Sequence, residues 1–138
     1  MRRFSIISLI ILALLVVACE GFSQTGVSTR SRSGLNGGEH AVRVGKANGT
    51  AEQSIELGDS SSSGVVLEAD VTLSVAKGLF RIELLGEEDS ATLKLEARDG
   101  QTTSGHGQMV IDAFGDASYR VTAEEAENVE YTILWTYQ

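Results

Sequence analysis

The sequence predicts an all-β fold, a small antiparallel β-sandwich or jelly roll of about eight strands that follows an N-terminal apolar segment and a polar tether. Apolar and polar residues alternate over several runs, as they do in strands with one buried and one solvated face. Turn residues separate these runs at intervals of roughly ten residues. No segment has the periodicity of a convincing helix, which favours a sandwich over a mixed fold.

The first 18 residues have the three parts of a secretory signal peptide. Arg2 and Arg3 give a positive start, residues 6–18 ("IISLIILALLVVA") are apolar, and the small Ala18 precedes the expected cut. A membrane-spanning helix needs about 20 apolar residues, and this run is followed at once by Glu20. We therefore expect residues 1–18 to be removed on export.

The only cysteine, Cys19, comes directly after this segment in "VVAC". This stretch resembles the lipobox of bacterial lipoproteins. The resemblance implies that Cys19 becomes the new N-terminus and carries diacylglycerol and palmitate-type acyl chains. Each buried CH₂ contributes roughly 0.8 kcal/mol, so two or three chains anchor a protein stably. The alternative, a structural disulfide, has no second cysteine within the chain.

The lipobox resemblance also predicts a location, the cell envelope. Lipoproteins with Asp after the cysteine tend to stay in the inner membrane, and this chain has Glu20. We expect an anchor in the outer membrane of an organism with two membranes, or on the outer face of the cell membrane of an organism with one. The first partner of the protein is then the membrane, through the lipid at Cys19.

The charge of the chain argues against nucleic acid as a partner. The sequence has 11 basic and 19 acidic residues, and loss of Arg2 and Arg3 with the signal leaves a mature chain of 120 residues with a net charge of −10. Binding to phosphates needs clustered Lys and Arg that displace counterions. Such a surface is unsuited to nucleic acid.

Residues 19–38 are predicted to be a lipid-anchored flexible tether. They are rich in Ser, Thr and Gly and show no period of 2 or 3.6. About 19 such residues have a root-mean-square span of roughly 25 Å, enough to lift a small domain off the headgroups. Residues 39–138 then form the β-sandwich domain.

Within 39–138, alternation predicts strands and Gly-rich or polar stretches predict the turns between them. The expected strands are His40–Val44, Thr50–Leu57, 66–76, 80–84, 93–96, Gln108–Phe114, Tyr119–Ala123 and 129–137. The expected turns are Lys46–Gly49, Gly58–Gly64, Ala76–Gly78, Gly86–Ser90, Arg98–Gly100 and Phe114–Ser118, with an acidic hairpin loop at Ala123–Asn128.

The closing hairpin, "GDASYRVTAEEAENVEYTILW", resembles the end of bacterial pre-peptidase C-terminal type β-sandwich modules. Those modules finish with a Gly-x-Tyr-x-Val strand, a short loop and a Tyr-x-Leu-x-aromatic strand. The residues that carry the likeness are Gly115, Tyr119, Val121, Tyr131, Ile133 and Trp135. The spacing from Gly115 to Tyr119 is longer than in those modules. The resemblance covers roughly the last seventy residues and implies fold and compartment, without catalytic residues.

Catalytic and metal-binding residues are not predicted. His40 and His106 are the only histidines; we expect His40 at the start of a strand and His106 in a loop or at a strand edge, outside the context of a nucleophile elbow. Two distant histidines and a lipidated cysteine do not form a zinc site. Calcium could use acidic loops, but no calcium-loop spacing is present. The acids concerned, Glu87, Glu88, Asp89, Asp112 and Asp116, are read as solvated charge.

The aromatic residues near the C-terminus leave one alternative open. Trp135 and Tyr137 could form a platform for a sugar, yet they share the parity of Tyr131 and Ile133, which favours the core. A glycan-binding module would show an exposed aromatic cluster on one face. A small envelope hydrolase, the second alternative, would place His106 in a pocket beside an acid and a hydroxyl.

The sequence therefore predicts a lipid-anchored, extracytoplasmic β-sandwich that is not an enzyme and uses no cofactor. Its expected role is binding or structural, with an envelope protein or a polysaccharide as partner. Exposed loops or a free strand edge would meet that partner.

Overall fold

A computed structural model describes residues 21–57 and 63–137. The signal peptide, Cys19 and most of the predicted Gly58–Gly64 turn lie outside these residues. Within them, no helix is long and apolar enough to cross a membrane.

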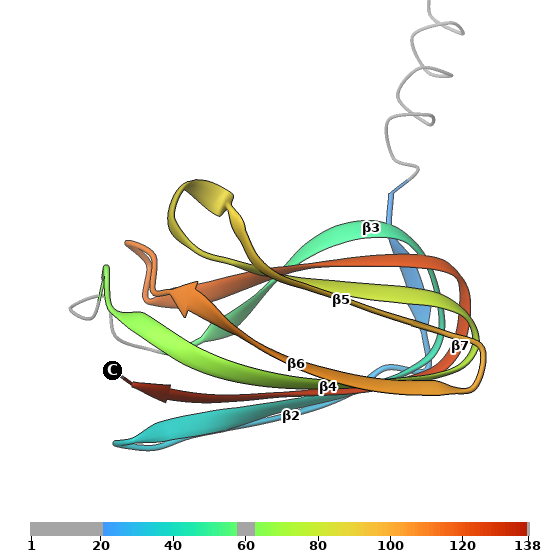
Figure 1. The fold of residues 1–138 in the computed structure, drawn as a ribbon, viewed down its shortest axis with the longest axis horizontal. Coiled ribbons are helices and arrows are strands. Elements are labelled where there is room, and N and C mark those ends of the chain that lie inside the picture. Colours follow the sequence, from blue (N-terminus) through green and yellow to red (C-terminus); the bar gives the residue numbers. More distant parts are fainter. Residues whose placement is uncertain (1–20, 58–62, 138) are drawn as a thin grey trace, which may run out of the picture.

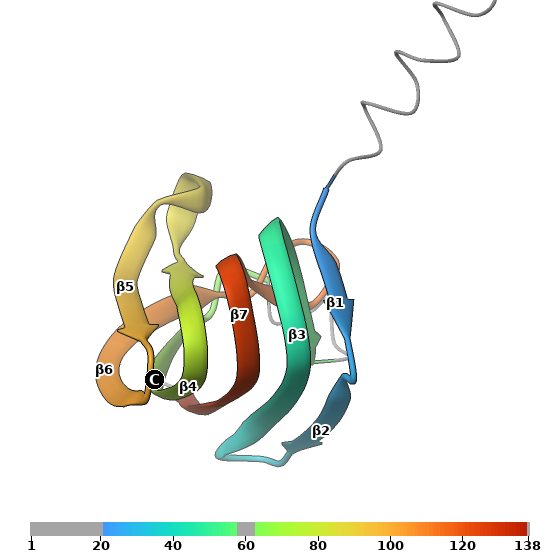
Figure 2. The same cartoon turned by 90° about the vertical axis from the view of Figure 1, so that its right-hand side faces the viewer.

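The described chain forms one antiparallel sheet of seven strands that folds over into a two-layered sandwich (Figures 1 and 2). This confirms the predicted fold class. A short 3₁₀ helix, Glu87–Asp89, connects β4 to β5. The strands are β1 (Ser23–Thr25), β2 (Ser28–Ser33), β3 (Gly37–Glu56), β4 (Val66–Leu85), β5 (Ala91–Arg98), β6 (Gln101–Val110) and β7 (Asp116–Tyr137).

The three long strands, β3, β7 and β4, lie side by side and each runs through both layers. Their register shifts between Ala47 and Gly49 and between Lys77 and Leu79, and such irregularities bend strands. Residues 37–44, 66–75 and 129–137 form the first layer, which β2 and β6 extend; residues 49–56, 79–85 and 116–123 form the second layer, which β5 extends. The bends lie at one end of the sandwich, and the opposite end is called the open end (Figure 1).

Three predicted turns are therefore bends within continuous strands. Lys46–Gly49 lies within β3, and Ala76–Gly78 lies within β4. The prediction of an acidic hairpin loop at Ala123–Asn128 is wrong because this segment lies within β7. A bend and a turn interrupt alternation in the same way, so the local pattern did not separate them. The Arg98–Gly100 turn is confirmed between β5 and β6. β6 begins at Gln101, earlier than the predicted Gln108.

The predicted tether also differs from the structure. Ser23–Thr25 and Ser28–Ser33 pair with β3 as edge strands, so the folded domain begins well before residue 39. Both strands are exposed along their whole length. Such strands need only backbone hydrogen bonds, which is why they carry no apolar period.

The core lies between the two layers and contains the inward-facing residues that alternation predicted. Phe80 stacks on Tyr131 with ring centroids 5.7 Å apart. Trp135 is 2% exposed, which confirms its core position. Its indole lies over Gly38, where a Cβ atom would come within 2.7 Å of Trp135 Cε2.

Candidate functional site

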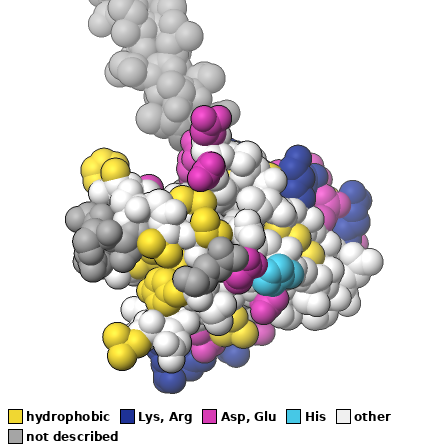
Figure 3. All heavy atoms as spheres, turned by 60° about the vertical axis from the view of Figure 1, so that its left-hand side comes forward, with side chains coloured by type: hydrophobic (Ala, Val, Ile, Leu, Met, Phe, Trp, Pro, Cys, Tyr) yellow, Lys and Arg dark blue, Asp and Glu magenta, His cyan; other side chains and the backbone are white. Residues whose placement is uncertain are grey.

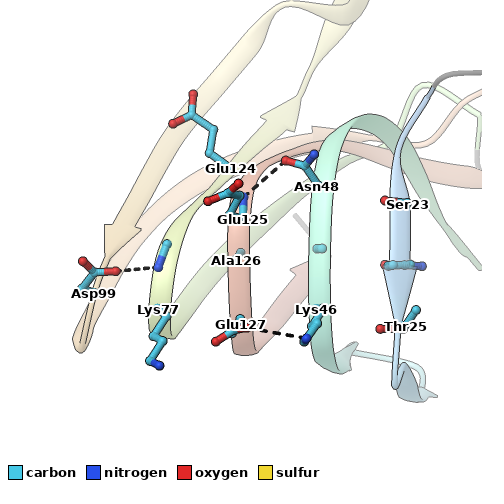
Figure 4. Close-up of a pocket in the computed structure, with 13 residues that line it drawn as sticks. Ser23, Thr25, Lys46, Asn48, Lys77, Asp99, Glu124, Glu125, Ala126 and Glu127 are labelled. Carbon is cyan, nitrogen blue, oxygen red and sulfur yellow. Dashed lines mark hydrogen bonds and ion pairs between the residues drawn. The ribbon is translucent and has the colours of Figure 1, made fainter.

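A groove of about 710 Å³ crosses the bends and forms our candidate ligand site (Figure 4). It brings together four strands and the β5–β6 turn. We call it the bend groove; it is lined by Ser23, Gln24 and Thr25 of β1, Lys46, Ala47 and Asn48 of β3, Lys77 and Gly78 of β4, Asp99, and Glu124, Glu125, Ala126 and Glu127 of β7.

Two side-chain caps hold the bends that shape the bend groove. The backbone N–H of Gly78 donates to Asp99 Oδ1 at 2.5 Å, and that of Glu125 donates to Asn48 Oδ1 at 3.3 Å. Gly78 has φ +82° and Glu125 has φ +45°, so both occupy the left-handed region that turns a strand sharply. The groove is therefore built from backbone geometry that the bends themselves require.

Most residues that line the bend groove are polar or charged, and both signs of charge are present. It carries four carboxylates and two ammonium groups, and Lys46 Nζ lies 3.8 Å from Glu127 Oε1. Ser, Thr, Asn and Gln side chains supply further donors and acceptors. Among the described residues, no aromatic side chain lines it. Such a lining suits a ligand with many hydroxyl groups, because each hydroxyl both donates and accepts.

A second polar feature is a chain of hydrogen bonds near β2 that runs from the exposed Ser31 into the core. Ser31 Oγ contacts His40 Nδ1, His40 Nε2 lies 3.2 Å from the Tyr119 hydroxyl, and that hydroxyl lies 2.7 Å from the hydroxyl of Tyr131. Burial lowers the pKa of His40, raises the pKa of Tyr119 to about 12, and raises that of Tyr131 further. His40 is the fourth residue of β3, so its position near the start of a strand is confirmed.

The contact between Ser31 and His40 brings a hydroxyl to a possible base. The group on the other side of the imidazole, however, is not the one that a hydrolytic triad has. A triad uses a carboxylate to orient the imidazole and stabilise its charged form. Here the partner is the neutral hydroxyl of Tyr119. A neutral partner and a lowered His40 pKa both favour a structural hydrogen-bond chain.

His106 lies on β6, which pairs only with β4 in the described sheet, so the expected strand-edge position is confirmed. Its side chain is 56% exposed on the outer face of the first layer, where its Nε2 lies 2.6 Å from Glu68 Oε2 and its Nδ1 lies 2.8 Å from Asp70 Oδ1. Figure 3 shows acidic side chains beside an exposed histidine. Among the described residues, both ring nitrogens contact acids and no hydroxyl reaches them. The pocket that a His106 hydrolase would require is not formed there.

The two histidines should make the free energy of unfolding depend on pH in opposite directions. Hydrogen bonds to Asp70 and then Glu68 raise the pKa of His106, so its contribution is full below 6.5 and is lost as pH rises through the folded-state pKa. Burial lowers the pKa of His40, so its contribution is present above 6.5 and is lost as pH falls below that value.

We therefore expect His106→Gln to lose stability relative to the unmodified chain at pH 6 but much less at pH 9. Between pH 7 and 5, the free energy of unfolding of His40→Gln should fall less than that of the unmodified chain. Urea unfolding across this pH range measures both effects. If the stabilities of the unmodified chain and of both variants changed in parallel with pH, the roles assigned to both histidines would be contradicted.

The acidic loops predicted as solvated charge meet at the open end. Glu87, Glu88, Asp89 and Asp112 line one hollow of about 570 Å³. Asp112 Oδ1 accepts from the backbone N–H groups of Phe114 and Asp116, which gives it a role in the turn. Within 21–57 and 63–137, no three His, Cys, Asp or Glu side chains are grouped so that they could hold a metal ion.

Exposed aromatic residues do not form a platform in the described part of the chain. Of its large hydrophobic side chains that are exposed, only Phe114 is aromatic, at 85% exposure. Trp135 is buried and Tyr137 is half-buried. The aromatic cluster that we expected of a glycan-binding module is therefore not present among these residues, and a sugar would have to be bound through polar groups.

No protein-family model matches the chain, and no curated protein matches it. Similar solved structures include the CBM22-1 xylan-binding domain of Xyn10C from Paenibacillus barcinonensis, with 12% identity and a TM-score of 0.40 over 86% of each chain. The GH26-CBM35 β-(1,4)-mannanase of Podospora anserina has 14% identity and a TM-score of 0.44 over 84% of this chain and 26% of its own. A Cupin_2 domain of an XRE family regulator from Enterobacter cloacae has 12% identity and a TM-score of 0.39 over 83% and 99%. Likenesses at these values do not assign a function.

Proposed function

We propose that this protein is a lipid-anchored, non-catalytic binding domain of the bacterial cell envelope whose ligand lies in the bend groove. The observation that carries the proposal is the groove itself, a hollow of about 710 Å³ that is lined mostly by polar and charged residues and is built by bends in three central strands. Specific sites are concave and place a few polar groups on rigid elements. The lipid anchor is supported by the signal segment and by Cys19 directly after it.

The ligand class that best fits the lining is a saccharide. Carboxylates at Asp99, Glu124 and Glu127 accept from sugar hydroxyls, and the ammonium groups of Lys46 and Lys77 donate to their oxygens. Hydrogen bonds to charged groups contribute about 1.5–3 kcal/mol each, more than neutral ones. A site without aromatic stacking therefore depends on these charged side chains for affinity.

The test is a pair of matched variants on β7. Glu127→Gln changes a carboxylate in the bend groove, whereas Glu130→Gln changes one that lies outside it and pairs with Arg43 on the first layer. We expect Glu127→Gln to weaken binding of oligosaccharides from envelope polysaccharides about tenfold or more, since about 1.4 kcal/mol corresponds to a tenfold change in Kd.

Isothermal titration calorimetry of the lipidated protein in detergent measures this binding. Glu130→Gln should leave the Kd unchanged. Equal effects of the two variants would remove the bend groove as the site, and no binding by the unmodified protein across the panel would remove saccharide as its ligand class.

A further inference from the structure

The N-terminal end of the described chain is fixed to the bend end of the sandwich. Ser23 of β1 pairs with Asn48, and Phe22 packs against the core. The chain crosses Gly49 so closely that a Cβ atom there would lie 2.9 Å from the carbonyl oxygen of Gly21. Figure 2 shows β1 beside β3. The domain therefore holds its N-terminal segment from Gly21 onward.

This position leaves very little chain between the domain and a lipid on Cys19. Only Glu20 separates Cys19 from Gly21, and each of the two chain steps spans at most about 3.6 Å, so the backbone of Cys19 lies within about 7 Å of that of Gly21. A flexible tether up to residue 38 would have allowed roughly 25 Å. Pairing of β1 and β2 with β3 removes that reach.

We propose that the bilayer surface that holds Cys19 is itself the partner of the bend end, so that the domain rests directly on the headgroups and the bend groove opens beside them. This inference rests on the lipid anchor in the proposed function. Ser23 and Thr25 line the groove only a few residues after Cys19, which places the groove within reach of the headgroup layer. A saccharide bound there would be one presented at the membrane surface.

The same geometry directs the open end away from the membrane. Gly37 and Lys46 delimit the part of β3 that runs from the open end to the bend, and nine residues of strand span about 30 Å. Leu35, which is 98% exposed, lies in the loop just before Gly37 at the open end. Leu35 is close to Gly21 in sequence but lies at the opposite end of the fold, whereas Glu124 is distant from Gly21 in sequence and lies in the bend groove.

The proposed orientation can be tested by comparing positions 124 and 35, because their order of distance from the membrane is the reverse of their order along the sequence. Glu124→Cys and Leu35→Cys are each introduced into the full lipidated chain, labelled with a fluorophore, and reconstituted into phosphatidylcholine vesicles that contain headgroup-quencher lipid. The thioether at Cys19 leaves one free thiol in each variant. We expect quenching at Glu124→Cys to exceed that at Leu35→Cys at least threefold. Equal quenching, or stronger quenching at Leu35→Cys, would overturn the proposed orientation.

A lengthened linker provides the control. Ten Gly and Ser residues inserted between Glu20 and Gly21 span about 16–19 Å and should release the domain. Quenching at Glu124→Cys should then fall toward the value at Leu35→Cys while the protein stays on the vesicles. Unchanged quenching would contradict the short connection as its cause. Failure of the unmodified chain to incorporate labelled fatty acid would instead refute the anchor, a separate result from a wrong orientation.

Discussion

Gly78→Ala is expected to destabilise the domain by about 3–5 kcal/mol, which is a large part of the 5–15 kcal/mol that a domain of this size has. Gly78 bends β4 at φ +82°, a conformation that costs an L-residue about 1–2 kcal/mol. An added Cβ would also lie 2.6 Å from the carbonyl oxygen of Glu124 and closer still to that of Glu125. These are backbone atoms of the neighbouring bend, so relief requires two strands to move.

Urea unfolding followed by circular dichroism measures the loss. Gly100→Ala is the matched control, because Gly100 has φ +70° in the β5–β6 turn but the described part of the chain has no atom within 4 Å of the added Cβ. We expect this control to lower the free energy of unfolding by about 1 kcal/mol, because only the left-handed backbone conformation opposes it. A Gly78→Ala variant no less stable than Gly100→Ala would show that the strands do not approach at the bend as described.

Trp135→Ala is expected to cost about 3–5 kcal/mol of unfolding free energy, as truncation of a buried aromatic side chain usually does. Trp135 is 2% exposed between the layers, and its ring lies over Gly38. Trp135→Phe should cost less, because it retains most of the apolar volume and the indole Nε1 has no partner to lose within the described chain. Thermal and urea denaturation measure both variants.

Phe114→Ala is the control for Trp135→Ala, because Phe114 is 85% exposed and should change stability by no more than about 0.5 kcal/mol. The comparison also separates a core residue from a binding platform. If Trp135→Ala left stability intact but abolished saccharide binding, the side chain would belong to a platform and our assignment of it to the core would be wrong.

Local patterns in the sequence were enough to predict the fold class and the core. Side chains of a strand alternate with a period of two, so the inward set on β7, which includes Tyr131, Ile133 and Trp135, follows from the order of the residues alone. The same alternation within residues 66–76 places Leu67 and Leu73 of β4 on one face, and both are buried in the core. The predicted signal and lipid attachment at Cys19 rest on sequence as well, since they are read from a contiguous stretch.

Only the tertiary structure decided which interruptions reverse the chain and which bend it. The stretches around Gly49 and Gly78 look like turns, but neighbouring strands bend together there and stay paired on both sides. Edge strand β2 was missed because exposed strands need no apolar period. The bend groove and the His40–Tyr119 contact join residues far apart in the chain, since pairing between distant strands, and no local periodicity, determines which side chains meet.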